Sequence, residues 1–245
     1  MKFREEEGRI GARIDGSAVA IVSGGLDSVT LAHLLAERGA RLHLISFDYG
    51  QRHRRELEFA QRTAQRLGAQ WSLVDLRAAG IASLLHGSAL TDPAVAVPDG
   101  HYTEDSMKAT IVPNRNAIML AIGCAAAYSS SAEVVALAVH AGDHFIYPDC
   151  RPDFIDAFEH MERLAMEMPT LRIEAPFLRK TKADIVRTGA DLGVPFEETW
   201  SCYRGGASHC GTCGTCVERR EAFAVAGVPD PTRYIAAQSK EASSA

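Results

Sequence analysis

Short apolar runs alternate along this chain with segments in which apolar residues recur at every third or fourth position. The short runs predict β-strands over 18–22, 41–47, 71–76, 133–139 and 171–176. The periodic segments predict helices over 28–39, 55–68, 116–130, 152–168 and 181–193. Strands separated by helices are typical of βαβ units, so the predicted fold class is α/β with a doubly wound parallel sheet.

Polar and glycine-rich segments follow three of the predicted strands. They are SGGLDS (23–28), FDYGQRH (47–53) and HAGDHFIYPDCRP (140–152). Doubly wound sheets bind ligands at the carboxyl ends of their strands, so we expect these segments to form one site. The segment 86–113 is long, polar and rich in Pro and Asp, which is typical of a functional or disordered loop.

The glycine pair in SGGLDS predicts a phosphate-binding turn between a strand and a helix. Gly24 and Gly25 leave room for a ligand beside the backbone, and the helix N-terminus supplies free N–H groups and the positive end of its dipole. Ser23 and Ser28 add hydroxyls, while Asp27 suits a site that also holds Mg²⁺. No Lys follows as in a Walker loop. The alternative is a plain tight turn capped by Asp27 or Ser28.

Four of the six cysteines lie between positions 202 and 216, with the spacing C-x7-C-x2-C-x2-C. They are Cys202, Cys210, Cys213 and Cys216. Four thiolates complete a tetrahedral Zn²⁺ site and leave no position for water, which predicts a structural metal. A redox dithiol or an Fe–S cluster is the alternative, and His209 could replace one cysteine.

The charge balance and the N-terminus restrict the class of protein. The net charge is −5 at pH 7, so no large basic surface for nucleic acid is expected. The first 17 residues are charged and lack the apolar core of a signal peptide, and the later apolar stretches are too interrupted to span a bilayer. We therefore expect a cytoplasmic protein without a membrane or a direct nucleic-acid partner.

The chain resembles a known family. SGGLDS after a first strand resembles the PP-loop of the N-type ATP pyrophosphatases. The other ordered motifs are FDYGQRH (47–53), VPNRN (112–116), HAGDHFIYPDCRPDF (140–154), TKADI (181–185), TWSCY (199–203) and HCGTCGTCVER (209–219). With them the chain resembles the 7-cyano-7-deazaguanine synthase family over nearly all of residues 18–223.

The resemblance implies a reaction and its cofactors. Such enzymes are said to adenylate 7-carboxy-7-deazaguanine with ATP and to let ammonia displace AMP. The amide forms first and, with a second ATP, the nitrile 7-cyano-7-deazaguanine. The implied cofactors are ATP, Mg²⁺ and Zn²⁺. A homodimer is compatible with the sequence.

The resemblance also implies a Rossmann-like, adenine nucleotide alpha hydrolase-like fold with a small C-terminal zinc-binding helical subdomain. Four parts are expected along the chain. They are an N-terminal extension (1–17), a PP-loop ATP-pyrophosphatase domain (18–195), a four-cysteine zinc-binding subdomain (196–230) and a flexible tail (231–245).

The resemblance and the chemistry of the motifs give candidate site residues. The catalytic candidates are Asp27, Arg115, Lys182 and Asp143. The candidates for ATP are Val22, Ser23, Gly24, Gly25, Leu26, Asp27, Ser28, Asp48, Tyr49, Arg52 and His53. The candidates for the deazaguanine substrate are Arg115, Asn116, Asp143, Tyr147, Asp149 and Arg151.

Several of these assignments have alternatives. Arg115 and Lys182 would bind phosphate or the substrate carboxylate, or would solvate a helix start. Asp149 and Arg151 would instead form a structural ion pair, and His53 is a proton shuttle or a plain hydrogen-bonded histidine. Tyr147 or Phe145 would stack on the substrate ring.

One residue departs from the family pattern. Asn114 stands in VPNRN where the family has Gly. Asn is the non-glycine residue that best tolerates the left-handed conformation, so the backbone is expected to be kept and the side chain to enter the site. This departure leaves open a relative that passes the activated acyl group to another amine, including a protein amine. A PP-loop tRNA-modifying enzyme and a non-enzymatic zinc module are two further hypotheses.

Overall fold

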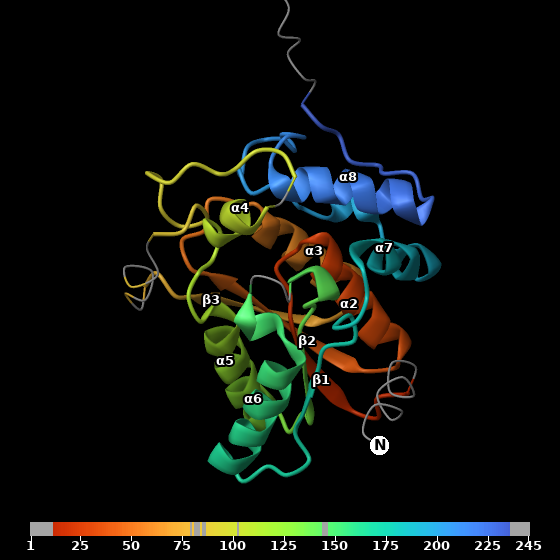
Figure 1. Cartoon of the computed structure of the whole chain (residues 1–245). Helices are drawn as coiled ribbons and strands as arrows, with labels where there is room; N and C mark the ends of the chain where they lie inside the picture. The colour runs from red at the N-terminus through yellow and green to blue at the C-terminus, as the bar shows by residue number, and fades with distance from the viewer. Residues whose placement is uncertain are drawn as a thin grey trace, which may run out of the picture.

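A five-stranded parallel sheet with strand order β3-β2-β1-β4-β5 forms the centre of the fold (Figure 1). The computed structural model describes residues 12–78, 80, 84, 87–101, 103–143 and 147–235. The strands are β1 (Ser17–Ile21), β2 (Arg41–Asp48), β3 (Gln70–Asp75), β4 (Val134–Ala136) and β5 (Arg172–Glu174). The predicted α/β class with a parallel, doubly wound sheet is therefore confirmed.

Helices cover both faces of the sheet. They are α2 (Leu26–Glu37), α3 (Glu56–Leu67), α4 (Glu104–Lys108), α5 (Arg115–Ser129), α6 (Pro152–Ala165), α7 (Lys182–Asp191) and α8 (Gly214–Ala226). Short 3₁₀ turns span Ala141–Asp143, Pro148–Cys150 and Phe196–Glu198. The layers are plain in Figure 1, where α5 and α6 lie on the side of the sheet opposite α2, α3 and α7.

Alternation along β1 separates two apolar cores. Ala18 and Ala20 belong to the core under α2, α3 and α7, whereas Val19 packs with α5 and α6 on the other face. All three side chains are fully buried. This is the pattern of a parallel strand covered by helices on both sides.

Three segments differ from the prediction. The strand expected over 133–139 is shorter in the structure, where Val134–Ala136 pairs with β1 and with the three-residue strand β5. A helix that the sequence did not predict, α4, lies inside the irregular segment 86–113. The tail expected to be flexible over 231–245 is bound in its described part, where the Ile235 N–H donates to the carbonyl oxygen of His209 (2.8 Å).

The described part of the N-terminal extension also belongs to the fold. Ile14 is buried in the core, and its N–H donates to the carbonyl oxygen of Arg38 (2.9 Å). Residues 1–11 and 236–245, and Phe145 as a stacking candidate, lie outside the described residues.

A fully buried arginine attaches the C-terminal helix to the rest of the chain. Arg219 of α8 donates to Thr199 Oγ1 (2.7 Å) and to the carbonyl oxygen of Phe196 (2.9 Å). It also pairs with Asp230 (Nε to Oδ1, 3.3 Å). Because each arm of the guanidinium has a partner, the buried charge is not left unpaired, and α8 is fixed against 196–201.

Candidate active site

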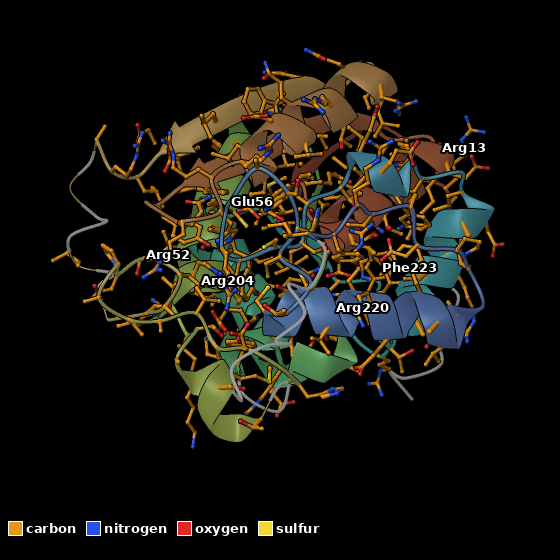
Figure 2. All side chains as sticks on the ribbon, turned by 90° about the horizontal axis from the view of Figure 1, so that it is seen from above. Arg13, Arg52, Glu56, Arg204, Arg220 and Phe223 are labelled. Atoms are coloured by element: carbon orange, nitrogen blue, oxygen red, sulfur yellow. The ribbon has the colours of Figure 1, made fainter. Side chains whose placement is uncertain are left out.

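A cavity among the described residues lies where the strand order reverses, between β1 and β4. In a doubly wound sheet the crevice at this point is the usual ligand site. The cavity is lined from the carboxyl ends of β1, β2 and β4 and from the starts of α2, α3, α5, α7 and α8. Figure 2, seen from above relative to Figure 1, shows Glu56 towards the interior of the molecule and Arg13 at its edge.

The SGGLDS loop opens onto this cavity and is held by its own serines. Ser28 Oγ accepts from the N–H groups of Ser23 and Gly24 (both 3.2 Å) and donates to the carbonyl oxygen of Gly25 (3.1 Å). Helix α2 begins at Leu26, and Gly25 provides no side-chain cap. The first-turn N–H groups of α2 therefore have no acceptor within the helix and can bind an anion from the cavity.

Gly24 is needed for packing and does not line the cavity. Its φ is +94°, and a Cβ there would overlap the carbonyl oxygen of Glu56 and lie 2.7 Å from the backbone nitrogen of Ala60. Its own carbonyl oxygen accepts from the N–H of Trp200 (2.9 Å). Gly24 thus lets the loop lie directly against α3, whereas the sequence predicted that its missing side chain leaves room for a ligand.

Replacing Gly24 by alanine is expected to destabilise the fold by roughly 3 kcal/mol or more, because positive-φ strain and a backbone clash add. Gly68 is the matched control, since it has φ +60° but no atom within 4 Å of the place that a Cβ would take. Gly68→Ala should cost only about 1 kcal/mol of strain. Urea unfolding measures both variants, and equal losses would contradict the packing role of Gly24.

A lysine and acidic residues meet beside the loop. Lys182 Nζ lies 2.7 Å from Asp27 Oδ2 and 3.3 Å from Glu218 Oε2, and 3.4 Å from His140 Nε2. Burial alone would lower the pKa of Lys182, but Asp27, Glu218 and Asp143 outweigh it and raise the pKa above its usual value. Lys182 therefore stays protonated at neutral pH.

Asp27 has a free oxygen in this group. Its Oδ1 is buried and has no hydrogen-bond partner among the described residues. An unpartnered buried carboxylate oxygen next to a phosphate-binding turn fits a hard cation such as Mg²⁺.

The opposite wall carries Arg115, the first residue of α5. Its Nη1 donates to Tyr49 OH (3.2 Å), and the guanidinium carbon lies 5.8 Å from the centre of the Tyr49 ring. Nearby, burial and a smaller contribution from Arg115 lower the pKa of His53 to about 3. Burial raises the pKa of Glu56 to about 8. At neutral pH this wall therefore holds one cation together with a neutral imidazole and a largely neutral carboxylic acid.

Most of the candidate residues come together in this one cavity. Those lining it are Val22, Ser23, Gly25, Leu26, Asp27, Ser28, Tyr49, His53, Arg115, Asn116, Asp143, Tyr147 and Lys182. The others have different places. Gly24, Asp48, Arg52, Asp149 and Arg151 do not line it.

The contacts of Asp48 and Arg52 explain why these two side chains do not line the cavity. Asp48 is buried and paired with Arg54 (2.6 Å) and Arg77 (3.1 Å). Arg52 Nη2 donates to the carbonyl oxygens of Asp92 and Val95 (2.5 and 2.7 Å), and so holds the 92–95 loop.

Asp149 and Asn114 shape the start of α5. Asp149 Oδ2 accepts from the backbone N–H of Asn116 (3.1 Å), which satisfies one of the free donors of the helix. Asn114 has φ 58° and precedes the helix, so the expected left-handed backbone is present. The expectation that its side chain enters the site is wrong, because Asn114 is exposed and does not line the cavity.

Several lining residues were not predicted. Among them are Glu56, Thr110, His140, Tyr203, Thr215 and Glu218. Tyr203 belongs to the motif TWSCY (199–203) and Glu218 to the motif HCGTCGTCVER (209–219), so these motifs could have indicated that both residues lie near the site. No sequence pattern indicated Glu56, because acidic residues are common in the first turn of a helix, where the helix dipole stabilises them.

The four cysteines form a compact group of sulfur atoms. Their sulfur atoms all lie within 4.8 Å of one another. Cys210 Sγ accepts from the backbone N–H groups of Thr212 (3.5 Å) and Cys213 (3.3 Å). His209 is engaged elsewhere, since its Nε2 accepts from the N–H of Ser201 (3.0 Å). The donors thus fit a soft metal with four sulfur ligands.

The cysteine group and the cavity share helix α8. This helix begins at Gly214, directly after Cys213. Thr215 and Glu218, near the start of the helix, line the cavity. Thr215 Oγ1 lies 3.4 Å from Cys213 Sγ. The position of Glu218 beside Lys182 therefore depends on the fold around the cysteines.

The strand order, the SGGLDS turn and the cavity at the reversal point together define a nucleotide-binding α/β protein of the PP-loop class. Residues 17–227 match the family model described as Queuosine biosynthesis protein QueC. The chain belongs to this family.

Named relatives agree with that family. The chain is 60% identical over 217 residues to a 7-cyano-7-deazaguanine synthase of Rhizobium meliloti (strain 1021), covering 88% of this chain and 91% of the relative. It is 59% identical over 217 residues to one of Ruegeria sp. (strain TM1040), covering 88% and 92%. In the described part of the chain, no helix has the length and apolar character needed to cross a membrane.

Proposed function

We propose that this protein is an ATP-dependent ligase that converts 7-carboxy-7-deazaguanine to 7-cyano-7-deazaguanine with ammonia as the nitrogen donor. The proposal rests on one observation in a chain that belongs to this family: the SGGLDS turn and the Lys182–Asp27 ion pair line the same cavity. Family membership supports ATP and the small-molecule substrate, and the cavity supplies the groups that the reaction needs.

The first half of the reaction activates an oxygen. A carboxylate oxygen of the substrate attacks the α-phosphorus of ATP, and pyrophosphate leaves. The N–H groups at the start of α2 bind the phosphate oxygens, and protonated Lys182 stabilises the charge that develops on them. Asp27 would hold Mg²⁺, which neutralises phosphate charge when bound. Ammonia then attacks the carbonyl carbon, and AMP leaves with the oxygen.

The second half repeats the same chemistry on the amide. The amide oxygen attacks the α-phosphorus of a second ATP, and pyrophosphate leaves. Loss of AMP and of the nitrogen-bound protons then gives the nitrile.

Other residues would bind the substrate and stabilise the fold. Arg115 is a bidentate donor suited to the substrate carboxylate. The substrate-side candidates are Asn116, Asp143 and Tyr147. Cys202, Cys210, Cys213 and Cys216 would hold Zn²⁺, which cross-links the C-terminal subdomain.

Incubating the purified protein with 7-carboxy-7-deazaguanine, ATP, Mg²⁺ and ammonium should yield the nitrile. Because each oxygen is removed through its own adenylate, two AMP and two pyrophosphate should form per nitrile. Mass spectrometry of the base and chromatography of the nucleotides measure both, with a reaction lacking the deazaguanine as control.

The products also separate the proposal from its rivals. Release of ADP, or the absence of any altered base, would contradict it. An amide that accumulates without nitrile, or a deazaguanine adduct on a protein, would instead support transfer to another amine. Modification of added tRNA would support a tRNA-directed enzyme.

A further inference from the structure

Glu56 is a cavity residue with a fixed orientation. Its side chain is 9% exposed, and Oε1 accepts from Gln51 Nε2 (3.2 Å). Gln51 cannot be turned over, because its Oε1 accepts from the Tyr49 N–H (3.0 Å) and its Nε2 also donates to the carbonyl oxygen of Phe47 (2.9 Å). The amide therefore donates to Oε1, and no hydrogen bond to Oε2 comes from the described residues.

The arginines near Glu56 in the sequence are engaged with other partners. Arg54 pairs with Asp48 (2.6 Å), Arg52 holds the 92–95 loop, and the guanidinium of Arg55 lies over the Trp200 ring at 5.2 Å. Glu56 thus sits in the cavity wall without an ion-pair partner among these three.

Burial, and not the groups that face it, keeps Glu56 neutral. His53 Nε2 lies 3.5 Å from Oε1, but the pKa of His53 is lowered to about 3, so this contact is not an ion pair. Burial raises the pKa of the Tyr49 phenol, which is therefore also neutral. Arg115 and the Gln51 hydrogen bond favour the carboxylate, yet burial dominates and the pKa of Glu56 rises to about 8.

A protonated carboxyl has a donor and an acceptor side by side. Beside it, His53 Nδ1 is buried without a hydrogen-bond partner among the described residues, and the His53 ring lies 5.0 Å from that of Tyr203. Phe47 and Trp200 also line the cavity. Neutral polar atoms between aromatic rings suit a flat, uncharged heterocycle, whereas the Lys182 group suits phosphates.

We propose that Glu56 is a specificity-determining residue whose Oε2 forms a hydrogen bond with the edge of a purine-like ring bound in the cavity. The inference rests on the proposed function, in which two such rings bind: the adenine of ATP and the deazaguanine of the substrate. A protonated Oε2 would donate to a ring acceptor, such as a ring nitrogen or a carbonyl oxygen, whereas an ionised Oε2 would repel that acceptor atom. Binding should therefore weaken when Glu56 loses its proton.

The test measures binding without turnover, so its failure is separate from failure of the proposed reaction. Calorimetry gives the Kd of MgATP and, in separate titrations, of 7-carboxy-7-deazaguanine between pH 7 and pH 9. For the ring that Glu56 contacts, wild-type affinity should fall about tenfold by pH 9, one unit above the pKa. Glu56→Gln keeps a donor and cannot ionise, so its affinity should lack this fall.

Comparing wild type with Glu56→Gln at each pH cancels titration of the ligand and of other groups. Glu58→Gln is the matched control, since Glu58 is on the same helix but exposed and near Arg62, and it should behave as wild type. The ligand whose Kd responds identifies the ring. Equal pH dependence in wild type and Glu56→Gln for both ligands would overturn the proposal.

Discussion

Replacing Lys182 by methionine is expected to lower kcat/KM for AMP release by roughly 10²- to 10³-fold. Lys182 is fixed by Asp27 at 2.7 Å and Glu218 at 3.3 Å, and its charge is present throughout the neutral pH range. Without it, these two carboxylates would face the negative charge that develops as pyrophosphate leaves. Steady-state AMP release with saturating ammonium measures the loss.

Lys180 provides the matched control. It lies two residues earlier and is exposed, so Lys180→Met should keep wild-type kcat/KM. Methionine is as good a helix former as lysine, but it leaves Asp27 and Glu218 without their cation, so the Lys182 variant should unfold at a lower temperature and is assayed where it remains folded. A folded Lys182→Met protein with wild-type activity would contradict the role of this cation.

The strands could be predicted from the sequence because each is a short apolar run in a parallel sheet buried on both faces. Val19 and Val135 are such positions, and both are fully buried. The sequence also predicted that SGGLDS, FDYGQRH and HAGDHFIYPDCRP share a site, since all three follow strands whose carboxyl ends meet, and residues of all three line the cavity. Local pattern and the topology of doubly wound sheets are enough for these conclusions.

The residues whose roles the sequence missed or assigned differently depend on how the folded chain packs around them. Gly24 was predicted as a phosphate contact, but its requirement comes from the backbone of α3 at Glu56 and Ala60, which is far away in the sequence. Asp48 follows a strand as a ligand-binding acid would, yet two arginines pair with it. Glu56 resembles an ordinary helix-start acid, and only its burial beside Gln51 and His53 distinguishes it.

Replacing Cys213 by alanine is expected to give the largest loss of stability. Cys213 is fully buried, and its sulfur is one of the four that lie within 4.8 Å of one another. With three sulfur ligands the metal would bind far more weakly, and structural Zn²⁺ contributes on the order of 10 kcal/mol to small metal-dependent folds. We expect a thermal midpoint lower by roughly 10 °C or more and less than one zinc per chain by elemental analysis.

Cys124→Ala separates loss of a metal ligand from loss of a buried thiol. Cys124 is equally buried but belongs to the core with α5 and α6, so its variant should keep full zinc and lose about 1 kcal/mol. Because Thr215 and Glu218 reach the cavity on the helix that follows Cys213, Cys213→Ala should lose activity together with metal. A metal-free Cys213→Ala protein that remains stable and active would refute the structural role, and with it the dependence of Glu218 on the cysteine group.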